Sequence, residues 1–327
     1  LERVLDGRTP DYLVVSHLEP DHAGSIKEFA DKYPEAKIVA SAKAIAMLPQ
    51  FFEIADLADR AVAVKEGEEL SLGSHTLQFF MAPMVHWPEV MVEYEKSEKI
   101  LFSADGFGKF GALDADEDWT CEARRYYFNI VGKYGAQVQA LLKKAATLDI
   151  QTICPLHGPI LKENLGYYIG KYMTWSSYEP EDDGVLVAYA SIHGNTKKAA
   201  EKMKEILEAK GAKKVAITDL SRDDMAEAIE DAFRYDKLVL AAASYDASVF
   251  PCMETFLNKL TNKNYQNRKI AIIENGSWAP VAAKNIKSMM EGCKNLTWTE
   301  TGVTIKSGVK EETKAQIKAL ADELWSK

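Results

Sequence analysis

The alternation of apolar and helical segments over residues 185–325 constrains the fold more than any other feature of the sequence. The first apolar segment, VLVAYAS (185–191), is unbroken, and the segment after it, 197–211, has the spacing of an amphipathic helix that ends at Gly211. The same succession repeats until five strand-like segments alternate with five helical ones. Strands joined through helices run parallel, and continuously apolar strands are buried on both faces. The sequence therefore predicts an α/β fold here: a doubly wound five-stranded parallel sheet with helices on both faces.

The first half of the chain has a less regular pattern. It contains short β-rich runs, with a long helical segment predicted over residues 122–146. The β-rich runs are YLVVS (12–16), KIVAS (37–41), TLQFFMAP (76–83), VMVEYE (90–95), KILFSAD (99–105) and TICPLH (152–157). The acidic stretch SSYEPEDDG (176–184) contains proline and glycine and is typical of a linker. We therefore expect one domain over residues 1–178 and a second over residues 184–327.

Composition argues against several classes of partner. The 327-residue chain carries a formal net charge of −9, and it has no block of lysine and arginine that would bind nucleic acid. No apolar stretch approaches the length of a membrane span, and the first residues, LERVLDGRTP, lack the apolar core of a signal peptide. We expect a cytoplasmic protein that binds neither nucleic acid nor membranes.

The first strand–helix connection, SIHGNTKKAA (191–200), has the composition of an anion-binding loop. Ser191, Asn195 and Thr196 offer side-chain donors, Gly194 allows the backbone to curl, and the amides at the helix start point toward an arriving anion. The loop matches neither GxxxxGK[ST] nor GxGxxG, which argues against a nucleoside triphosphatase and a dinucleotide fold. The alternative is a tight turn that caps a helix.

Two further strand ends favour a ligand over a simple turn. ASYDASVFP (243–251) and NGSWAP (275–280) follow the third and fourth strands, and each offers an aromatic ring beside small and hydrogen-bonding residues. Ligands in doubly wound sheets bind beyond the carboxyl ends of strands, so we expect a flat heteroaromatic ring with a terminal phosphate between these loops. The predicted binding residues are Ser191, Ile192, His193, Gly194, Asn195, Thr196, Ser244, Tyr245, Asp246, Ala247, Asn275, Gly276, Ser277 and Trp278.

A dense group of metal-ligating residue types follows the apolar run YLVVS, in the stretch SHLEPDHAGS (16–25). If the chain stays extended beyond the run, His17, Glu19 and Asp21 project to one side, and His22 follows at a turn. This HxExDH arrangement can supply two metal ions, the first from His17 and Glu19 and the second from Asp21 and His22.

Three more candidate ligands follow apolar runs elsewhere in the first half, namely His86, Asp105 and His157. Taken singly, each is typical of a packed histidine or a turn residue, but strand ends can converge on one edge of a sheet. The total of four imidazoles and three carboxylates, with one bridging hydroxide, would neutralise two divalent ions and permit burial. Oxygen-rich coordination without thiolates favours iron or manganese over structural zinc.

Both halves resemble known families. The second half resembles flavodoxin, whose phosphate loop has the form (S/T)xTGNT, with His193 in place of a threonine. The first half resembles the metallo-β-lactamase superfamily, whose hydrolases carry HxHxDH, with Glu19 in place of a histidine. The combination, over essentially the whole chain, is similar to the flavodiiron proteins, or A-type flavoproteins. The resemblance implies a metallo-β-lactamase-like αββα sandwich followed by a flavodoxin-like domain that binds flavin mononucleotide (FMN).

The resemblance also implies an activity and a role for each ligand. It implies reduction of nitric oxide to nitrous oxide, or of dioxygen to water, at a non-haem diiron centre fed by FMN. One iron would be held by His17, Glu19 and His86, the other by Asp21, His22 and His157, with Asp105 between them. Phe107, Trp87 and Tyr94 would line the pocket at the irons, with packing in the core as the other interpretation of Tyr94.

Partners follow from the same resemblance. It implies a head-to-tail homodimer, or a tetramer, in which the flavin of one subunit serves the irons of another. Because the sequence has no CxxC pair, we expect a separate electron donor such as a rubredoxin or a reduced deazaflavin. The HxExDH motif begins only sixteen residues after the start, so we expect the first strands of the sandwich to be missing and metal loading to be weak.

Two alternative functions stay open. The first is a dinuclear metal hydrolase of the metallo-β-lactamase superfamily, which Glu19 disfavours. The second is a flavodoxin-like electron carrier whose metal domain is not functional.

Overall fold

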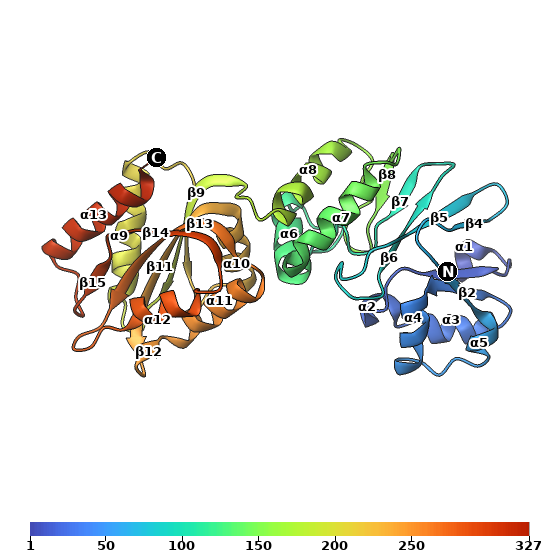
Figure 1. Cartoon of the computed structure of the whole chain (residues 1–327), viewed down its shortest axis with the longest axis horizontal. Helices are drawn as coiled ribbons and strands as arrows, with labels where there is room; N and C mark the ends of the chain where they lie inside the picture. The colour runs from blue at the N-terminus through green and yellow to red at the C-terminus, as the bar shows by residue number, and fades with distance from the viewer. Residues whose placement is uncertain (327) are drawn as a thin grey trace. The chain divides into compact units, whose positions relative to one another are not determined.

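The computed structural model describes residues 1–326 (Figure 1). These residues form two compact units, each drawn from two separate parts of the chain. Unit 1 comprises Leu1–Ala123 and Ala136–Met173, and unit 2 comprises Arg124–Gly135 and the chain from Thr174 onward. Among the helices of residues 1–326, none combines the length and the apolar character that a membrane span requires.

Unit 1 contains two β-sheets within the described residues. The first is parallel and has the order β1 (Tyr12–Val15), β2 (Lys37–Ser41), β3 (Ala61–Val64). The second has the order β4 (Glu69–Ser71), β5 (Thr76–Met81), β6 (Met91–Glu95), β7 (Ile100–Phe102), β8 (Thr152–Cys154). Its neighbours are antiparallel except for β7 and β8, which run parallel. The sequence pattern did not predict β3 or β4, because both are short and β4 has a single apolar residue.

Apolar side chains arrange these sheets as a layered sandwich. Between the sheets lie Val39, Val64, Phe79 and Met91, while the next residue of β2, Ala40, points to the opposite face. That opposite face packs against α3 (Ile26–Lys32) and α4 (Ala42–Met47). The outer face of the second sheet is covered by α7 (Gly135–Ala145). The order helix, sheet, sheet, helix confirms the predicted αββα sandwich. The remaining short helices of unit 1 are α1 (Glu2–Leu5), α2 (Pro20–Ala23), η1 (Leu48–Gln50) and α5 (Leu57–Arg60).

Unit 2 has the predicted doubly wound parallel sheet. Its order is β10 (Val215–Asp219), β9 (Asp182–Ala190), β11 (Tyr235–Tyr245), β13 (Gln266–Asn275), β14 (Lys294–Trp298). A further strand, β15 (Val303–Ile305), also pairs with β13 and corresponds to the fifth predicted strand, TGVTI (301–305). The sequence pattern did not predict β14, which pairs with another part of β13. A short strand, β12 (Ser248–Val249), turns back antiparallel onto β11.

Helices cover both faces of this sheet (Figure 1). The side chains of α9 (Asn195–Ala209) and α13 (Glu311–Trp325) pack together on one face, against alternate residues such as Val187 and Val239. The other helices of unit 2 are α10 (Met225–Arg234), α11 (Pro251–Asn262) and α12 (Ala282–Met289), which contact β11, β9 and β13, respectively. Gly211, with φ +92°, follows the end of α9 as the sequence predicts.

The helix predicted over residues 122–146 is divided in the structure. Here α6 (Trp119–Tyr126) passes into a π-helical turn, η2 (Tyr127–Val131), then into η3 (Gly132–Tyr134) and α7. The hydroxyl of Tyr178 accepts a hydrogen bond from the amide of Gly135 (3.1 Å) and donates to the carbonyl of Gly132 (2.9 Å). Because the Tyr178 hydroxyl binds these backbone groups, and because both residues are glycines, the regular backbone hydrogen bonds of an α-helix are interrupted here.

The stretch predicted to be a linker is also ordered by packing. Ser176 ends α8 (Leu165–Ser176) and is buried, as is Tyr178. Within unit 2, Glu181 accepts hydrogen bonds from Arg124 Nε (2.8 Å) and Trp175 Nε1 (2.7 Å). Composition alone could not reveal this pairing, because the partners lie elsewhere in the sequence.

The segment Arg124–Gly135 is bound into unit 2 by buried charge and by stacking. The guanidinium of Arg124 pairs with Glu230 as well as Glu181, and the ring of Phe128 stacks on Phe233 with centroids 4.2 Å apart. Burial raises the pKa of Glu230 to about 7, although the Arg124 charge opposes this shift. The domain limits 1–178 and 184–327 stay a prediction, while the compact units assign this segment to the second unit.

Strand β6 carries two buried glutamates whose ionisation is displaced in opposite directions. Burial raises the pKa of Glu93 to about 8, against the hydrogen bond that its carboxyl accepts from Ser16 Oγ (2.9 Å). Two residues along the strand, burial disfavours the ionised form of Glu95, but the amides of Ser97 and Glu98 donate to its carboxylate and hold its pKa at about 2. Glu93 is therefore a neutral acid in the folded protein at neutral pH.

We predict that Glu93→Gln stabilises the metal-free protein at pH 8 by about 4 kcal/mol and near pH 5 by less than about 1 kcal/mol. The folded-state pKa of Glu93 lies above its unfolded value, so the wild-type free energy of unfolding falls as pH rises from about 5 to about 8. Denaturant unfolding at several pH values measures this slope. The matched control, Glu95→Gln, lowers stability without changing the slope in this window. Parallel curves for wild type and Glu93→Gln would contradict the prediction.

Candidate metal centre and flavin pocket

The carboxylate of Asp105 lies at the centre of the predicted metal ligands. Its Oδ1 is 3.0 Å from His22 Nε2 and 3.7 Å from His157 Nε2. Its Oδ2 is 3.0 Å from His86 Nε2 and 3.4 Å from His17 Nε2. Each oxygen thus faces a different pair of histidines, which is the geometry of a carboxylate between two cations.

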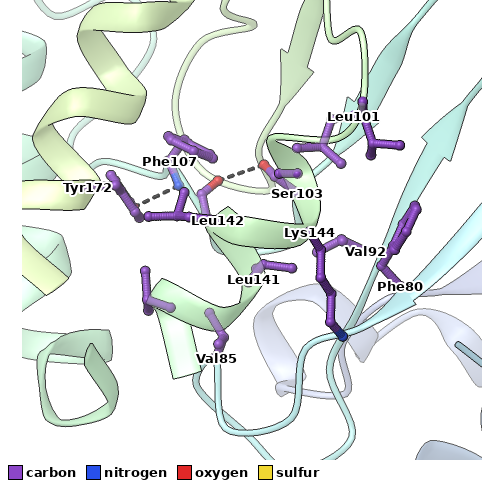
Figure 2. A pocket seen from close by; sticks show the side chains of 14 residues that line it. Phe80, Val85, Val92, Leu101, Ser103, Phe107, Leu141, Leu142, Lys144 and Tyr172 are labelled. Carbon is purple, nitrogen blue, oxygen red and sulfur yellow. Dashed lines mark hydrogen bonds between the residues drawn. The ribbon is translucent and has the colours of Figure 1, made fainter. Parts of the chain in front are cut away.

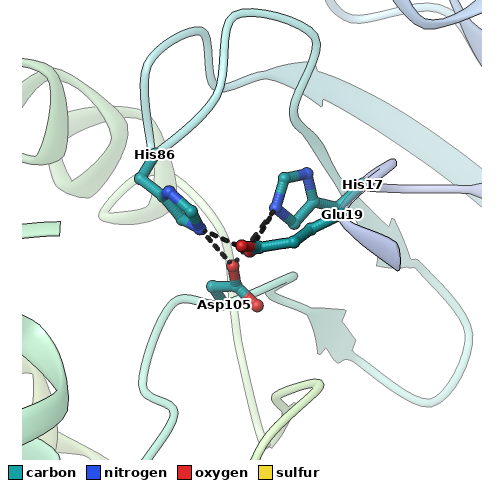
Figure 3. Close-up of side chains that lie close together, drawn as sticks. All are labelled: His17, Glu19, His86 and Asp105. Atoms are coloured by element: carbon teal, nitrogen blue, oxygen red, sulfur yellow. Dashed lines mark hydrogen bonds and ion pairs between the residues drawn. The ribbon is translucent and has the colours of Figure 1, made fainter. Parts of the chain in front are cut away.

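The seven predicted ligands gather into two groups. In the first, ligand atoms of His17, Glu19, His86 and Asp105 all lie within 4.8 Å of one another (Figure 3). The second group obeys the same limit and consists of Asp21, His22 and His157. In the first group, Glu19 Oε2 is 3.0 Å from His86 Nε2 and 3.4 Å from His17 Nε2. In the second, Asp21 Oδ2 is 3.2 Å from His157 Nε2.

Strand ends and one short helix bring these side chains together. His17 follows β1, Asp105 follows β7 and His157 follows β8, while His86 lies in the β5–β6 loop. The predicted extended path through Asp21 is wrong, because Pro20 begins α2 and puts Asp21 and His22 on its first turn. Proline favours the first position of a helix, where its missing N–H costs nothing.

Glu89, which the sequence did not identify as a site residue, orients His17. Its Oε1 lies 2.7 Å from His17 Nδ1 and accepts a hydrogen bond from the amide of Leu18 (3.0 Å). An Nδ1–H that donates to Glu89 leaves Nε2 directed at the centre, as is usual for metal-binding histidines. The signal in the sequence is a glutamate three residues after His86, just before the buried strand β6, but its partner is seventy-two positions away.

Charge is strongly coupled around Asp105. Burial disfavours its ionised form, yet the hydrogen bonds and positive charges of His22, His86 and His17 hold the Asp105 pKa well below its usual range. Burial also disfavours protonated His22 and His86, but the Asp105 carboxylate outweighs burial and raises the pKa of both. The ionised Asp105 carboxylate therefore favours positive charge on the groups around it, and a metal ion bound among them would supply such charge.

The donor set fits a pair of divalent cations. His17 Nε2 is buried, and although two carboxylate oxygens lie 3.4 Å away, it makes no hydrogen bond among residues 1–326. A buried nitrogen of this kind is satisfied by a metal ion, since burial without a partner is costly. Four imidazoles, three carboxylates and no thiolate suit iron or manganese more than structural zinc.

The three aromatic residues predicted to line the site lie in different places. The ring of Trp87 contacts His17, with centroids 5.3 Å apart. Phe107 is buried two residues after Asp105, beside the ring of Tyr172. Tyr94 instead donates a hydrogen bond to the carbonyl of Asp149 (2.8 Å) and is part of the sheet packing, which was the other interpretation of this residue.

The predicted flavin residues line a pocket of about 410 Å³ beyond the carboxyl ends of β9, β11 and β13 in unit 2. This is where ligands bind in doubly wound sheets. All of the predicted residues line it except Gly194, which precedes α9 at φ +84° and donates its amide to Ser191 Oγ (3.1 Å). At the rim, the side chain of Trp278 is 93% exposed.

Polar groups at the base of the pocket are ordered by their neighbours. Thr196 is buried, and its Oγ1 lies 3.4 Å from Asn275 Nδ2. Asn275 Oδ1 accepts a hydrogen bond from the amide of Ser307 (3.1 Å). Gly276 is required by close packing, because a Cβ there would lie 2.9 Å from Pro280 Cα. Ser307 also lines the pocket and was not predicted, since it follows β15 rather than one of the three loops.

Comparisons with known proteins agree with the two halves of the fold. The sequence model of the family described as ODP family beta lactamase matches residues 1–158, and the sequence model of the flavodoxin domain family matches residues 186–319. A nitric oxide reductase of Moorella thermoacetica is 27% identical over 94% of this chain and 78% of its own length. Diflavin flavoprotein A 1 of Synechocystis sp. is 33% identical over 69% of this chain, which spans only 40% of that protein.

Two solved structures have the same two-domain fold. Rubredoxin oxygen:oxidoreductase from Desulfovibrio gigas aligns over 98% of this chain and 82% of its own, with a TM-score of 0.89 and 25% identity. The flavodiiron protein from Giardia intestinalis aligns over 96% of this chain and 78% of its own, with a TM-score of 0.90 and 25% identity. With a β-lactamase-like domain that gathers seven metal-ligating residues, followed by a flavodoxin domain, this chain belongs to the flavodiiron proteins.

Proposed function

We propose that this protein reduces nitric oxide to nitrous oxide, or dioxygen to water, at a non-haem diiron centre that receives electrons through FMN. The observation that carries the proposal is the Asp105 carboxylate, whose two oxygens face two separate groups of ligands. The names of the relatives from Moorella thermoacetica and Desulfovibrio gigas support the two substrates.

In this proposal the ligands divide between two irons. His17, Glu19 and His86 would hold the first, and Asp21, His22 and His157 would hold the second. Asp105 would contribute to both, because each of its oxygens faces one group. The irons, when bound, supply binding positions and electrons for the gas. Glu89 keeps His17 oriented, and the Trp87 ring covers His17 from one side.

The flavodoxin-like unit holds FMN in the 410 Å³ pocket. Amides at the start of α9, with the Thr196 hydroxyl, would bind the phosphate, and the rings of Tyr245 and Trp278, which line the pocket, would contact the flavin. We also propose that a separate protein such as a rubredoxin donates the electrons, and that the chain forms a head-to-tail homodimer or a tetramer. The exposed Trp278 at the rim supports a partner that approaches the flavin edge.

The proposed activity predicts gas consumption by protein loaded with ferrous iron and FMN. Two nitric oxide molecules, two electrons and two protons should yield nitrous oxide and water. Under anaerobic conditions, with reduced rubredoxin or a chemical reductant, an electrode measures nitric oxide loss and gas chromatography measures nitrous oxide. A parallel oxygen-electrode assay ranks the two substrates. Hydrolysis of a thioester or lactam without reductant, and no gas consumption, would instead favour the hydrolase.

Asp105→Asn tests the bridging role. Removing one charge from between the cations should lower iron content from about two to one or fewer per chain, with loss of activity, because ligand geometry and charge are both altered. FMN absorbance stays unchanged, since the flavin pocket lies in unit 2. Asp116→Asn, at an exposed position, is the matched control. Full iron loading of Asp105→Asn would exclude a bridge at this residue.

Thr196→Val tests the phosphate site. Loss of a hydroxyl that binds a charged phosphate should weaken FMN binding about tenfold or more. Fluorescence titration of the flavin-free protein measures this change, and iron content is expected to stay the same. Thr218→Val, on β10 and outside the pocket, is the control with the same substitution. Equal affinity in the two variants would remove Thr196 from the binding site.

A further inference from the structure

A small apolar cavity lies in unit 1, between α7 and the outer face of β5, β6 and β7 (Figure 2). Its volume is about 30 Å³. Its wall is formed mainly by the apolar side chains of Phe80, Val92, Leu101, Leu141 and Leu142. On the same measure of volume, one water molecule needs roughly 10–15 Å³, so the cavity is large enough for a diatomic molecule.

The buried end of the cavity reaches the turns that carry two of the metal ligands. Val85, directly before His86, and Gly106 and Phe107, directly after Asp105, all line it. Polar groups of this wall already have partners within the protein. The Ser103 hydroxyl donates to the Gly106 carbonyl (2.6 Å), and the Phe107 amide donates to the Tyr172 hydroxyl (2.7 Å). A water in the cavity would therefore find few free partners.

The opposite end of the cavity is closer to solvent. Phe80, Leu141 and Leu148 are only partly buried, whereas Val85 and Phe107 are buried. Lys144 lines this end with its aliphatic stem, and its ammonium group donates to Glu66 (2.9 Å) and to the carbonyl of Met81 (3.0 Å). Partly exposed residues of α7 and residues adjacent to two metal ligands therefore share the wall of one cavity.

We propose that this cavity binds a small apolar gas and supplies it to the metal site past Val85 and Phe107. Cavities lined by apolar groups stay dry and accept apolar guests such as xenon, because water cannot satisfy its hydrogen bonds inside them. Nitric oxide and dioxygen have the size and weak polarity that such a cavity accepts. The supply role rests on the proposed gas reduction, whereas gas binding itself does not.

Xenon tests the binding site without requiring activity. Crystals of the FMN-loaded protein under xenon pressure should show anomalous xenon density in the cavity. In Ala145→Leu, the larger side chain fills the cavity and the density is lost. The control is Ala140→Leu, the same substitution at an exposed position of α7, which should keep the xenon. Absence of xenon from the wild-type cavity would overturn the proposal.

Kinetics then test the supply role. In iron-loaded protein, Ala145→Leu should raise the KM for nitric oxide and for dioxygen by roughly threefold or more at unchanged kcat, because gas arrives less often at an intact site. Iron and FMN contents are measured for each variant, and Val138→Ala, which enlarges the cavity, should keep xenon and the wild-type KM. Loss of xenon with an unchanged KM would overturn the supply role. If the wild-type protein consumes neither gas, the proposed function fails, while the xenon density still decides gas binding.

Discussion

The buried carboxylate of Asp105 governs the arrangement of unit 1. A carboxylate withdrawn from water is costly unless opposite charge or hydrogen-bond donors surround it. Here each oxygen faces two imidazoles, which arrive from the ends of β1 and β8, from α2 and from the β5–β6 loop. These elements must therefore end at one edge of the sandwich. Because Asp105 lies three residues beyond the end of β7, a shift of β7 by one residue would move this carboxylate away from the four histidines.

The regular half of the fold follows directly from the sequence because its strands are buried on both faces. Such strands appear as unbroken apolar runs, and the helices between them keep a single periodicity. Deviations occur where tertiary contacts replace local preference. The helix predicted over 122–146 is interrupted around Gly132, where the hydroxyl of Tyr178 binds the backbone. Strand β4 has too little apolar character to be predicted from its own residues.

The candidate site is predicted almost completely, for a comparable reason. Each of its ligands directly follows an apolar run or belongs to one dense motif, so its chemistry is visible locally. Glu89 was missed because its role depends on contact with His17, and Ser307 because β15 brings it to the pocket from another loop. The cavity beside Phe107 was also beyond prediction, since a void depends on how side-chain volumes pack.

The interleaving of the two units has a consequence for how this chain can be divided. Unit 2 takes Arg124–Gly135 from the middle of the first half. If the chain were cut once, before Thr174, the flavodoxin-like part would lose the guanidinium that neutralises Glu181 and Glu230, together with the ring that stacks on Phe233. Two partly or fully buried carboxylates would remain without their cation. The flavin-binding half is therefore not a transferable module, and recombination that moved it as one contiguous segment would yield an incompletely packed protein.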